Sequence, residues 1–526
     1  MARTGKGMIV CPQPQAAEAG LEVLRAGGNA VDAAVVTAFV QAVIDPQMCG
    51  IGGSGVMLVH SAKDRTDTVI DFYARAGRQV SPHQWEAIFI REAADRYGYV
   101  LEGWVNDAGY QSVGVPGTVA GLAEALGRFG SLPWREALRP AIKVARVGCP
   151  VTGNVAGNWL VDHGPDVVPY DRRLQWTAES KRIYTKAGLM YAVGELIENP
   201  DYAQTLERLA EFGAEDFYRG DIAAQIAADF QANGGFITTD DLAEYTPYVS
   251  KPVRGSYRGR TVVAAGPPAG GLTLLQMLNY LEAFDLGAAG WPSLEAARRR
   301  VEAMGWAVAE REAHLADPRF ADVPVEQLAA KEYAAAARAA HDSPNTTHVC
   351  VVDGEGNAVS LTHTLGSSSG VVTPGLGFTY NNYLNCFDPR PDRVNSLAAG
   401  KTRVTMMVPT MAFAGDRLEI VLGAPGGTKI VTGVLQSLLN MVDHGMDPVN
   451  AVSSPRIDFQ GDVVQAEQRV PGDVLEGLGR LGYRVNRRPF SYDSYFARAQ
   501  AIRVHEDGRL EGASDPRKDG GIALST

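Results

Sequence analysis

The sequence predicts an α+β protein, because the spacing of its apolar residues changes from a helical to a strand pattern near residue 345. Residues 14–45 and most of 115–340 carry Ala-rich segments with apolar residues at helical spacing. After 345, short runs of Val, Leu and Phe are separated by Gly, Asn and Asp, which is typical of strands and turns. We therefore expect a mostly helical first part and a strand-rich last third.

Two helices are expected within residues 14–45, separated by Gly-Gly-Asn at 27–29. The second is apolar on nearly every side, which predicts that it is buried. A glycine-rich segment at 50–55 precedes an apolar strand at 56–60. A dinucleotide-binding loop has the opposite order, strand then helix, so we interpret this segment as close packing of backbone between a helix and a strand.

The remaining elements are predicted from the same two patterns. A helix cap is expected at Thr-Thr-Asp-Asp, residues 238–241. The expected strands are 349–352, 358–362, 378–380, 411–413 and 418–422. Two helical segments, at about 428–444 and 473–482, are expected to close the chain.

Composition excludes several classes of protein. The 526 residues are 45% hydrophobic and 21% charged, which is ordinary for a globular chain with a large core. The net charge of -11 and the absence of a basic tract argue against a nucleic-acid partner. Five cysteines without Cys-x-x-Cys spacing indicate neither a disulfide framework nor a zinc site, and no metal or cofactor is indicated. With no secretory or membrane-spanning run, we expect a soluble cytoplasmic protein without a membrane partner.

Thr346 is the candidate nucleophile. It stands in Asn-Thr-Thr-His, residues 345–348, after turn-forming residues and before an apolar strand. If the chain is cut before Thr346, the new α-amine, which titrates near ~8, can accept the proton of the Thr346 hydroxyl. The three residues carry little weight by themselves, because Thr-Thr-His before a strand also arises by chance.

Gly426 and Gly427 are candidates for an oxyanion-binding turn. They lie in Gly-Ala-Pro-Gly-Gly-Thr-Lys, residues 423–429, between an expected strand and an expected helix. Amides at a helix N-terminus can face an anion, although a plain strand-to-helix turn also explains the spacing. His348 and His363 fall in or beside strands, where a structural role is the commoner one. No Gly-x-Ser-x-Gly motif supports a serine hydrolase of that type.

Several separated segments together resemble one family, the γ-glutamyltranspeptidases, or glutathione hydrolases, of the N-terminal-nucleophile hydrolase superfamily. They occur in the family's order over nearly the whole chain. The matching segments are 27–34 (Gly-Gly-Asn-Ala-Val-Asp-Ala-Ala), 50–53 (Gly-Ile-Gly-Gly), 115–121 (Val-Pro-Gly-Thr-Val-Ala-Gly), 234–242 (Gly-Gly-Phe-Ile-Thr-Thr-Asp-Asp-Leu), 267–271 (Pro-Pro-Ala-Gly-Gly), 346–348 (Thr-Thr-His), 381–382 (Asn-Asn), 425–427 (Pro-Gly-Gly) and 512–517 (Gly-Ala-Ser-Asp-Pro-Arg).

The resemblance implies a four-layer αββα sandwich and a precursor that cuts itself between Asn345 and Thr346. A large subunit, 1–345, would pair with a small subunit, 346–526, and both would contribute to the central sheets. Thr346 is then the nucleophile, Thr364 a second Thr that hydrogen-bonds it, and Gly426 and Gly427 the oxyanion-hole glycines. The implied reaction is acyl transfer from a small-molecule amide to water or an amine through an ester. The oligomeric state stays open, a higher oligomer included.

The residues that would read a γ-glutamyl group depart from the family pattern. The family's Asp-Phe-Arg-Glu element is Asp-Phe-Tyr-Ala at 71–74, so Tyr73 replaces the carboxylate-binding Arg. The family's tandem serines align with Thr405 and Met406, and its Asn after the second Thr aligns with Gly366. Its Asn-Asn-Gln-x-x-Asp-Phe element keeps Asn382 but carries Tyr383 and Cys386 in place of Gln and Asp.

These changes predict an amidohydrolase with a flatter, more apolar or aromatic acyl pocket. Each lost charge-assisted contact is worth roughly 1.5 to 3 kcal/mol. Arg75 and Arg403 lie near the lost anchors in sequence and are weaker candidates for reading a carboxylate. Relatives with such changes resemble cephalosporin acylases, oxamate-type amidohydrolases and carbon–carbon hydrolases of antibiotic pathways. Glutathione hydrolysis or γ-glutamyl transfer, and ligand binding without turnover, remain as alternatives.

Overall fold

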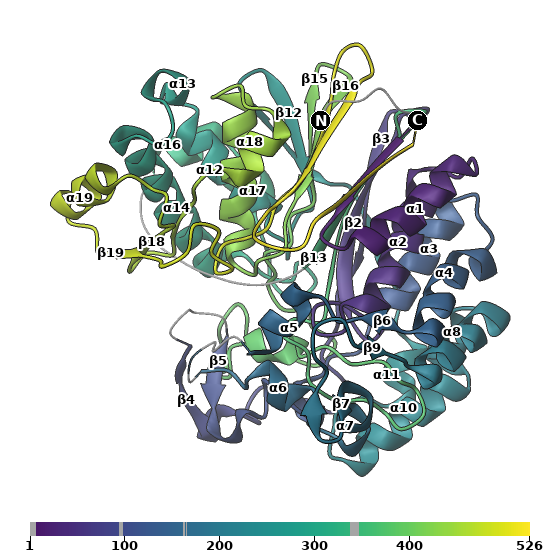
Figure 1. Cartoon of the computed structure of the whole chain (residues 1–526). Helices are drawn as coiled ribbons and strands as arrows, with labels where there is room; N and C mark the ends of the chain where they lie inside the picture. The colour runs from purple at the N-terminus through teal and green to yellow at the C-terminus, as the bar shows by residue number, and fades with distance from the viewer. Residues whose placement is uncertain (1–6, 94–97, 161–163, 165, 337–346, 526) are drawn as a thin grey trace.

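The computed structural model describes residues 7–93, 98–160, 164, 166–336 and 347–525 as four layers: helices, two sheets face to face, and helices again (Figure 1). One sheet is seven-stranded. Its order is β10 (Tyr248–Ser250), β3 (Thr66–Phe72), β2 (Ser54–Ser61), β14 (Ala358–Thr364), β13 (Thr347–Asp353), β1 (Gly7–Cys11), β22 (Gly521–Ser525). The other has six strands, in the order β11 (Val253–Tyr257), β12 (Arg260–Ala264), β15 (Thr410–Ala414), β16 (Arg417–Gly423), β20 (Gln500–Val504), β21 (Leu510–Ser514).

Helices cover the outer face of each sheet (Figure 1). Over the seven-stranded sheet lie α1 (Pro14–Arg25), α2 (Ala30–Ile44), α3 (Thr118–Phe129), α4 (Trp134–Val147) and α8 (Pro200–Phe212). Over the six-stranded sheet lie α12 (Gly271–Leu281), α14 (Leu294–His314), α16 (Lys331–Ala336), α17 (Lys429–Val442) and α18 (Pro448–Ser453).

Shorter elements surround these layers. The helices are α5 (Gly153–Leu160), α6 (Tyr170–Arg173), α7 (Ala178–Tyr184), α9 (Glu215–Arg219), α10 (Asp221–Ala232), α11 (Thr239–Ala243), α13 (Leu286–Ala289), α15 (Val325–Leu328) and α19 (Gly472–Arg480), with a 3₁₀ turn, η4, at Tyr383–Cys386. The strands are β4 (Phe89–Glu92), β5 (Tyr99–Leu101), β6 (Cys149–Pro150), β7 (Thr185–Lys186), β8 (Leu189–Met190), β9 (Leu196–Ile197), β17 (Ile457–Phe459), β18 (Val464–Ala466) and β19 (Val485–Arg487).

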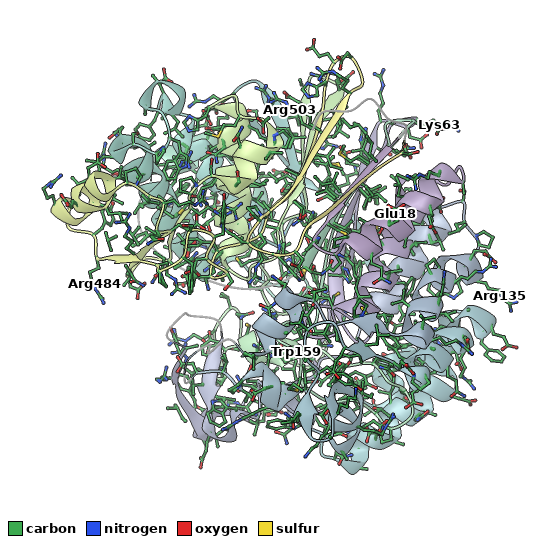
Figure 2. The ribbon with its side chains drawn as sticks, viewed as in Figure 1. Glu18, Lys63, Arg135, Trp159, Arg484 and Arg503 are labelled. Atoms are coloured by element: carbon green, nitrogen blue, oxygen red, sulfur yellow. The ribbon has the colours of Figure 1, made fainter. Side chains whose placement is uncertain are left out.

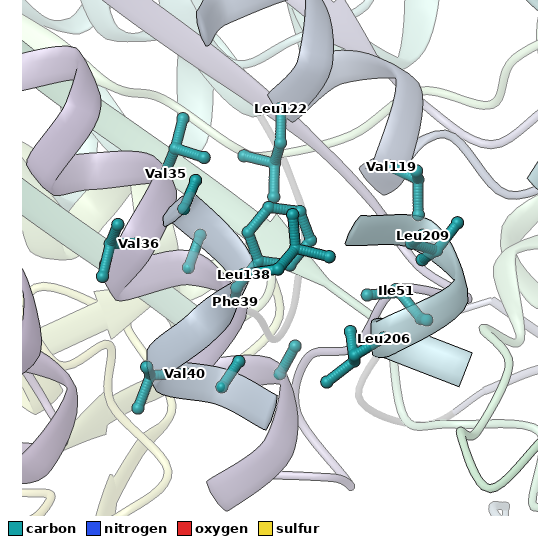
Figure 3. Close-up of a cluster of buried hydrophobic side chains, with 14 of the residues drawn as sticks. Val35, Val36, Phe39, Val40, Ile51, Val119, Leu122, Leu138, Leu206 and Leu209 are labelled. Carbon is teal, nitrogen blue, oxygen red and sulfur yellow. The ribbon is translucent and has the colours of Figure 1, made fainter. Parts of the chain in front are cut away.

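The core is divided by the sheets. Figure 3 shows part of the cluster between the seven-stranded sheet and its helices, where Phe39 of α2 is surrounded by Leu122, Leu138 and Leu206. A separate apolar cluster fills the space between the two sheets. Charged side chains such as Glu18 and Arg135 lie at the surface, whereas Trp159 of α5 is buried (Figure 2). The two faces of each sheet are therefore both covered.

The predicted helix pair in residues 14–45 is confirmed. Asn29 caps α2 by accepting hydrogen bonds from the amides of Val31 and Asp32, and the Asp32 side chain accepts one from the Asn29 amide. All of α2 except Val43 is buried, as its apolar sequence predicts. The cap at Thr238, the strand after residue 53 and the expected strands at 349–352, 358–362, 411–413 and 418–422 are also present.

One strand prediction is wrong, because residues 378–380 form only isolated bridges to Gly52 and Val372. The stretch expected to be mostly helical is so, but it also contains the strands β10, β11 and β12. The two helices expected near the end of the chain are present as α17 and α19, and β20, β21 and β22 follow them. β10 and β22 pair with strands far away in the sequence, and local pattern identifies such strands poorly.

Segments on both sides of residue 346 build both sheets. β1, β2, β3 and β10 join β13, β14 and β22 in one sheet, and β11 and β12 join later strands in the other. The expected cleavage point between Asn345 and Thr346 lies outside the described residues. Within the described part of the chain, no helix is long and apolar enough to cross a membrane.

Candidate active site

Thr364 is the last residue of β14, the central strand of the seven-stranded sheet. Thr347 of β13 lies opposite His363, and Ser54 of β2 lies opposite Thr364. The Thr364 Oγ1 accepts a hydrogen bond of 2.8 Å from the amide of Gly366. Thr346, the predicted nucleophile, lies outside the described residues.

His348 and His363, at this end of β13 and β14, make structural contacts. His348 Nδ1 lies 2.8 Å from Thr362 Oγ1, and His363 Nε2 lies 2.8 Å from Gln41 Oε1. Burial lowers the pKa of each imidazole to about 3, with a smaller contribution from His363 at His348 and from Lys518 at His363. Both rings are therefore neutral at physiological pH, in agreement with the structural interpretation.

A buried ion pair holds the loop that follows Thr364. The Asn382 carboxamide accepts a hydrogen bond of 2.8 Å from the Ser367 amide and donates to the backbone and side-chain oxygens of Asp107. Arg173 pairs with the Asp107 carboxylate and donates at 2.8 Å to the Ser368 carbonyl. These contacts give Asn382, expected to touch substrate, a role in holding the loop, with Gly366 at its start in a left-handed conformation, φ 72°.

Gly426 and Gly427 form a strained turn between β16 and α17, as the sequence predicts. Their φ angles are 143° and 67°. A Cβ on Gly426 would lie 2.4 Å from the Ala497 Cα, so the turn requires glycine there. Among the described residues, neither glycine amide has a hydrogen-bond acceptor. Two free donors before a helix are the arrangement that an oxyanion needs.

A row of hydroxyls runs across the sheet from Thr364. Ser54 lies opposite Thr364, and because Gly55 lies opposite Phe72, the same register brings Tyr73 beside Ser54. Ser54 Oγ and Tyr73 Oη are buried, and neither has a hydrogen-bond partner in the described part of the chain. Side chains of alternate residues share a face, and Tyr73 belongs to the cluster between the sheets, so the row faces the six-stranded sheet. Two strand spacings put the Cα atoms of Thr364 and Tyr73 roughly 10 Å apart.

Tyr383 belongs, like Tyr73, to the cluster between the two sheets. Its Oη is also buried and has no partner among the described residues, and the Arg403 guanidinium lies 4.4 Å from its ring centre. Burial raises the pKa of Tyr73 well above its ordinary value, and nearby Asp71 and Tyr383 raise it further. Burial likewise raises the pKa of the Asp71 carboxyl to about 7, although Arg75 opposes the shift. The structure thus brings Tyr73 and Tyr383 together, as the sequence comparison predicts.

Four other predicted residues have different surroundings. Arg75 donates to the Thr246 carbonyl at 2.6 Å and lies over the Tyr245 ring. Met406 packs with the helices outside the six-stranded sheet, where its sulfur receives a hydrogen bond from Arg311. The Thr405 hydroxyl accepts from the Met407 amide at 3.4 Å, and Cys386 is half-buried at the end of η4. These contacts do not bring Met406 into the space between the sheets.

The family comparison agrees with this geometry. The gamma-glutamyltranspeptidase profile matches residues 16–525. The chain belongs to the gamma-glutamyltranspeptidase family. As in other members, the fold is the four-layer α+β sandwich of the N-terminal-nucleophile hydrolases, and the chain is a hydrolase or acyltransferase acting on carbon–nitrogen bonds.

Proteins similar to this chain include both acylases and glutathione hydrolases. The acylase ACY 1 proenzyme of Pseudomonas sp. (strain V22) is 37% identical, over 98% of this chain and 93% of its own length. The glutathione hydrolase proenzyme of Escherichia coli (strain K12) is 34% identical, over 98% and 91%. The crystal structure of cephalosporin acylase from Bacillus halodurans superposes with a TM-score of 0.89 and 31% identity, over 99% and 96%. The Pseudomonas acylase and the Escherichia coli glutathione hydrolase are both named as proenzymes, which accords with self-processing.

Sequence reasoning missed Ser54, Asp107 and Arg173. Ser54 stands inside the glycine-rich segment that was interpreted only as close packing. That interpretation is itself supported, since Cβ atoms on Gly53 and Gly55 would lie 2.5 Å from the carbonyls of Thr364 and Thr362. No local signal marks Asp107 and Arg173, because they meet only in the folded chain.

Proposed function

We propose that the chain matures by cleavage before Thr346 and then hydrolyses or transfers the acyl group of an amide through an ester on the Thr346 hydroxyl. The observation that carries the proposal is the end of the β13–β14 strand pair, where Thr347, the residue after the proposed nucleophile, lies opposite His363, next to Thr364. The oriented hydroxyl of Thr364 and the free amides of Gly426 and Gly427 support this chemistry.

The mechanism follows from these groups. The new α-amine of Thr346 takes the hydroxyl proton as the oxygen attacks the amide carbon. The tetrahedral oxyanion receives hydrogen bonds from the Gly426 and Gly427 amides. Collapse expels the amine, which leaves with the proton, and water or an acceptor amine then resolves the ester by the same steps. The Asp107–Arg173 pair and Asn382 hold the Thr364 loop in place during both halves of the cycle.

We further propose that the acyl group is not γ-glutamyl. Position 73 offers a phenol hydroxyl in place of a guanidinium, and Tyr383 offers a second one. Two neutral donors in an apolar surrounding favour an uncharged or singly charged acyl chain over a zwitterion. An acylase-type amide, of the kind for which the 37% identical relative is named, fits better than glutathione.

Two experiments test the proposal. The purified chain should yield two fragments, the smaller beginning at Thr346, without added protease, while Thr346→Ala should stay intact and inactive. An uncut chain that still turns over an amide would contradict this mechanism. A set of 4-nitroanilides with γ-glutamyl, butanoyl, glutaryl and phenylacetyl groups tests the acyl assignment, and preference for γ-glutamyl would make the chain a glutathione hydrolase or γ-glutamyltransferase instead.

A further inference from the structure

Arg498 is a buried guanidinium with unused hydrogen-bond donors. Arg498 follows Ala497, whose backbone packs against Gly426, and Arg498 is 5% exposed. Nη2 donates at 2.8 Å to the Ser494 carbonyl, but among the described residues Nε and Nη1 have no partner. Burial lowers the pKa of this guanidinium. A buried charge with unpaired donors is costly unless an anion completes the site.

The acidic groups around Arg498 are already committed to other cations. Asp515 pairs with Arg456 and Arg517, and Asp493 with Arg488. Asp45 pairs with Lys518 and accepts a hydrogen bond from Gln13. Each raises the pKa of Arg498 through space, yet none forms a hydrogen bond with its guanidinium. The protein therefore supplies a net attraction for an anion here without filling the position itself.

Arg498 is adjacent to the catalytic groups. Its amide donates at 2.8 Å to the Pro425 carbonyl, one residue before Gly426. Tyr170, at the start of α6, interacts electrostatically with Arg498 and hydrogen-bonds Ser367 in the loop after Thr364. Arg498 is thus connected to the oxyanion turn through its backbone amide and to the Thr364 loop through Tyr170.

Arg498 also lies on the opposite side of β13 from the hydroxyl row. Ser54 and Tyr73 lie beyond β14, toward β3. Asp45, a charged neighbour of Arg498, is bonded to Gln13 after β1 and to Lys518 before β22, which are the strands on the other side of β13. If the acyl chain lies along the hydroxyl row, the amine leaves on the side of Arg498.

We propose that the Nε and Nη1 donors of Arg498 bind a carboxylate carried by the leaving amine, so that the substrates are N-acyl derivatives of amino acids or of other carboxylated amines. The inference rests on the proposed amide-cleaving function and deepens it. Arg498 acts as a specificity-determining residue that holds the leaving group, and takes no part in the transfer of the acyl group.

A matched pair of substrates tests this assignment. The acyl group preferred in the nitroanilide screen is attached to 4-aminobenzoate or to 4-aminobenzamide, which differ in charge but hardly in size. The matured wild-type enzyme should show a kcat/KM about tenfold or more higher for the carboxylate, mostly through KM. Arg498→Gln should reduce this ratio to about one and leave the benzamide substrate within about threefold of wild type. Arg498→Lys should retain part of the preference.

Arg488→Gln is the control, because Arg488 is a partly exposed arginine that pairs with Asp493, an acidic neighbour of Arg498. It should keep the wild-type ratio. A purely structural role of Arg498 predicts equal losses for both substrates, and the melting temperature separates loss of folding from loss of selectivity. A wild-type ratio near one, which needs no variant, would overturn the assignment even if amide cleavage is confirmed. Failure to cleave any acyl anilide would instead contradict the proposed function and remove the basis of this inference.

Discussion

The Thr364 loop and the hydroxyl row touch each other but use their polar groups in opposite ways. The residues that hold the loop, Asn382, Asp107 and Arg173, are bonded to protein groups. The hydroxyls of Ser54 and Tyr73 in the row, and of Tyr383 near it, are buried and unpaired among the described residues. Buried polar groups in folded proteins are nearly always paired, so an unpaired set indicates a place where a ligand completes the bonding. The difference separates residues that hold the site from residues that meet the substrate.

Removing the Arg173 guanidinium, which holds the Thr364 loop through Asp107, should have the largest effect on stability. Arg173→Met leaves the Asp107 carboxylate buried without its partner, which should cost about 3–5 kcal/mol of unfolding free energy. Urea unfolding measures this loss, and kcat of the remaining folded enzyme should also fall because the Thr364 loop is released. Arg146→Met is the control, since the Arg146–Glu207 pair is exposed and should be worth less than about 1 kcal/mol. Equal losses for the two variants would contradict the holding role.

Gly426→Ala should have the next largest effect. A Cβ there meets the Ala497 Cα at 2.4 Å, so the turn must move and its amides lose their direction. We expect kcat to fall by about 10²–10³-fold, the effect of removing an oxyanion donor. Gly445→Ala introduces a side chain at a φ of 62° where no atom lies within 4 Å, and it should cost stability without affecting kcat. An active Gly426→Ala variant would disprove the oxyanion assignment.

Tyr73→Phe should affect binding more than stability. The Tyr73 hydroxyl makes no hydrogen bond to the residues that the structure describes, so its removal should leave the melting temperature unchanged or slightly higher. KM for the preferred acyl substrate should rise by about tenfold, the value of one hydrogen bond of ~1.4 kcal/mol. Tyr218→Phe is the matched control, because its buried hydroxyl bonds the Pro116 carbonyl and the Ala120 amide. That variant should lose stability and keep KM; the reverse pattern would show that the row does not bind substrate.

The last prediction concerns the pH dependence of stability. Burial raises the pKa of Asp71 from 3.8 to about 7, so the folded state favours the protonated carboxyl. The stability this group contributes is fully present below pH 3.8 and is lost as pH rises toward 7. Asp71→Asn should remove this slope, so that the variant gains stability relative to wild type at pH 8 but not at pH 4. Urea unfolding at both values measures it, and parallel pH profiles would refute the assignment.

Much of the architecture was predictable because it depends on local chemistry. The Asn29 cap, the apolar surface of α2, and the strands containing Val349 and Val359 each follow from residues close together in the sequence. The turn at Gly426 was found for the same reason, since a strand, two glycines and a helix are adjacent. β22 was missed because its pairing partner, β1, lies at the other end of the chain, and β22 lies in a different sheet from β21.

The sequence by itself indicated the family, because the family's motifs occur in order along one chain, and that resemblance implied the αββα layers and Thr346 as the nucleophile. The tertiary structure alone decided which polar groups are satisfied. In the folded chain, Asn382 bonds Asp107 of the Asp107–Arg173 pair, and Met406 packs in the helical core. Tyr73 and Arg498, on opposite sides of β13, keep donors that no described residue accepts. Pairing and burial depend on groups hundreds of residues apart, and only the folded chain brings those groups within hydrogen-bonding distance.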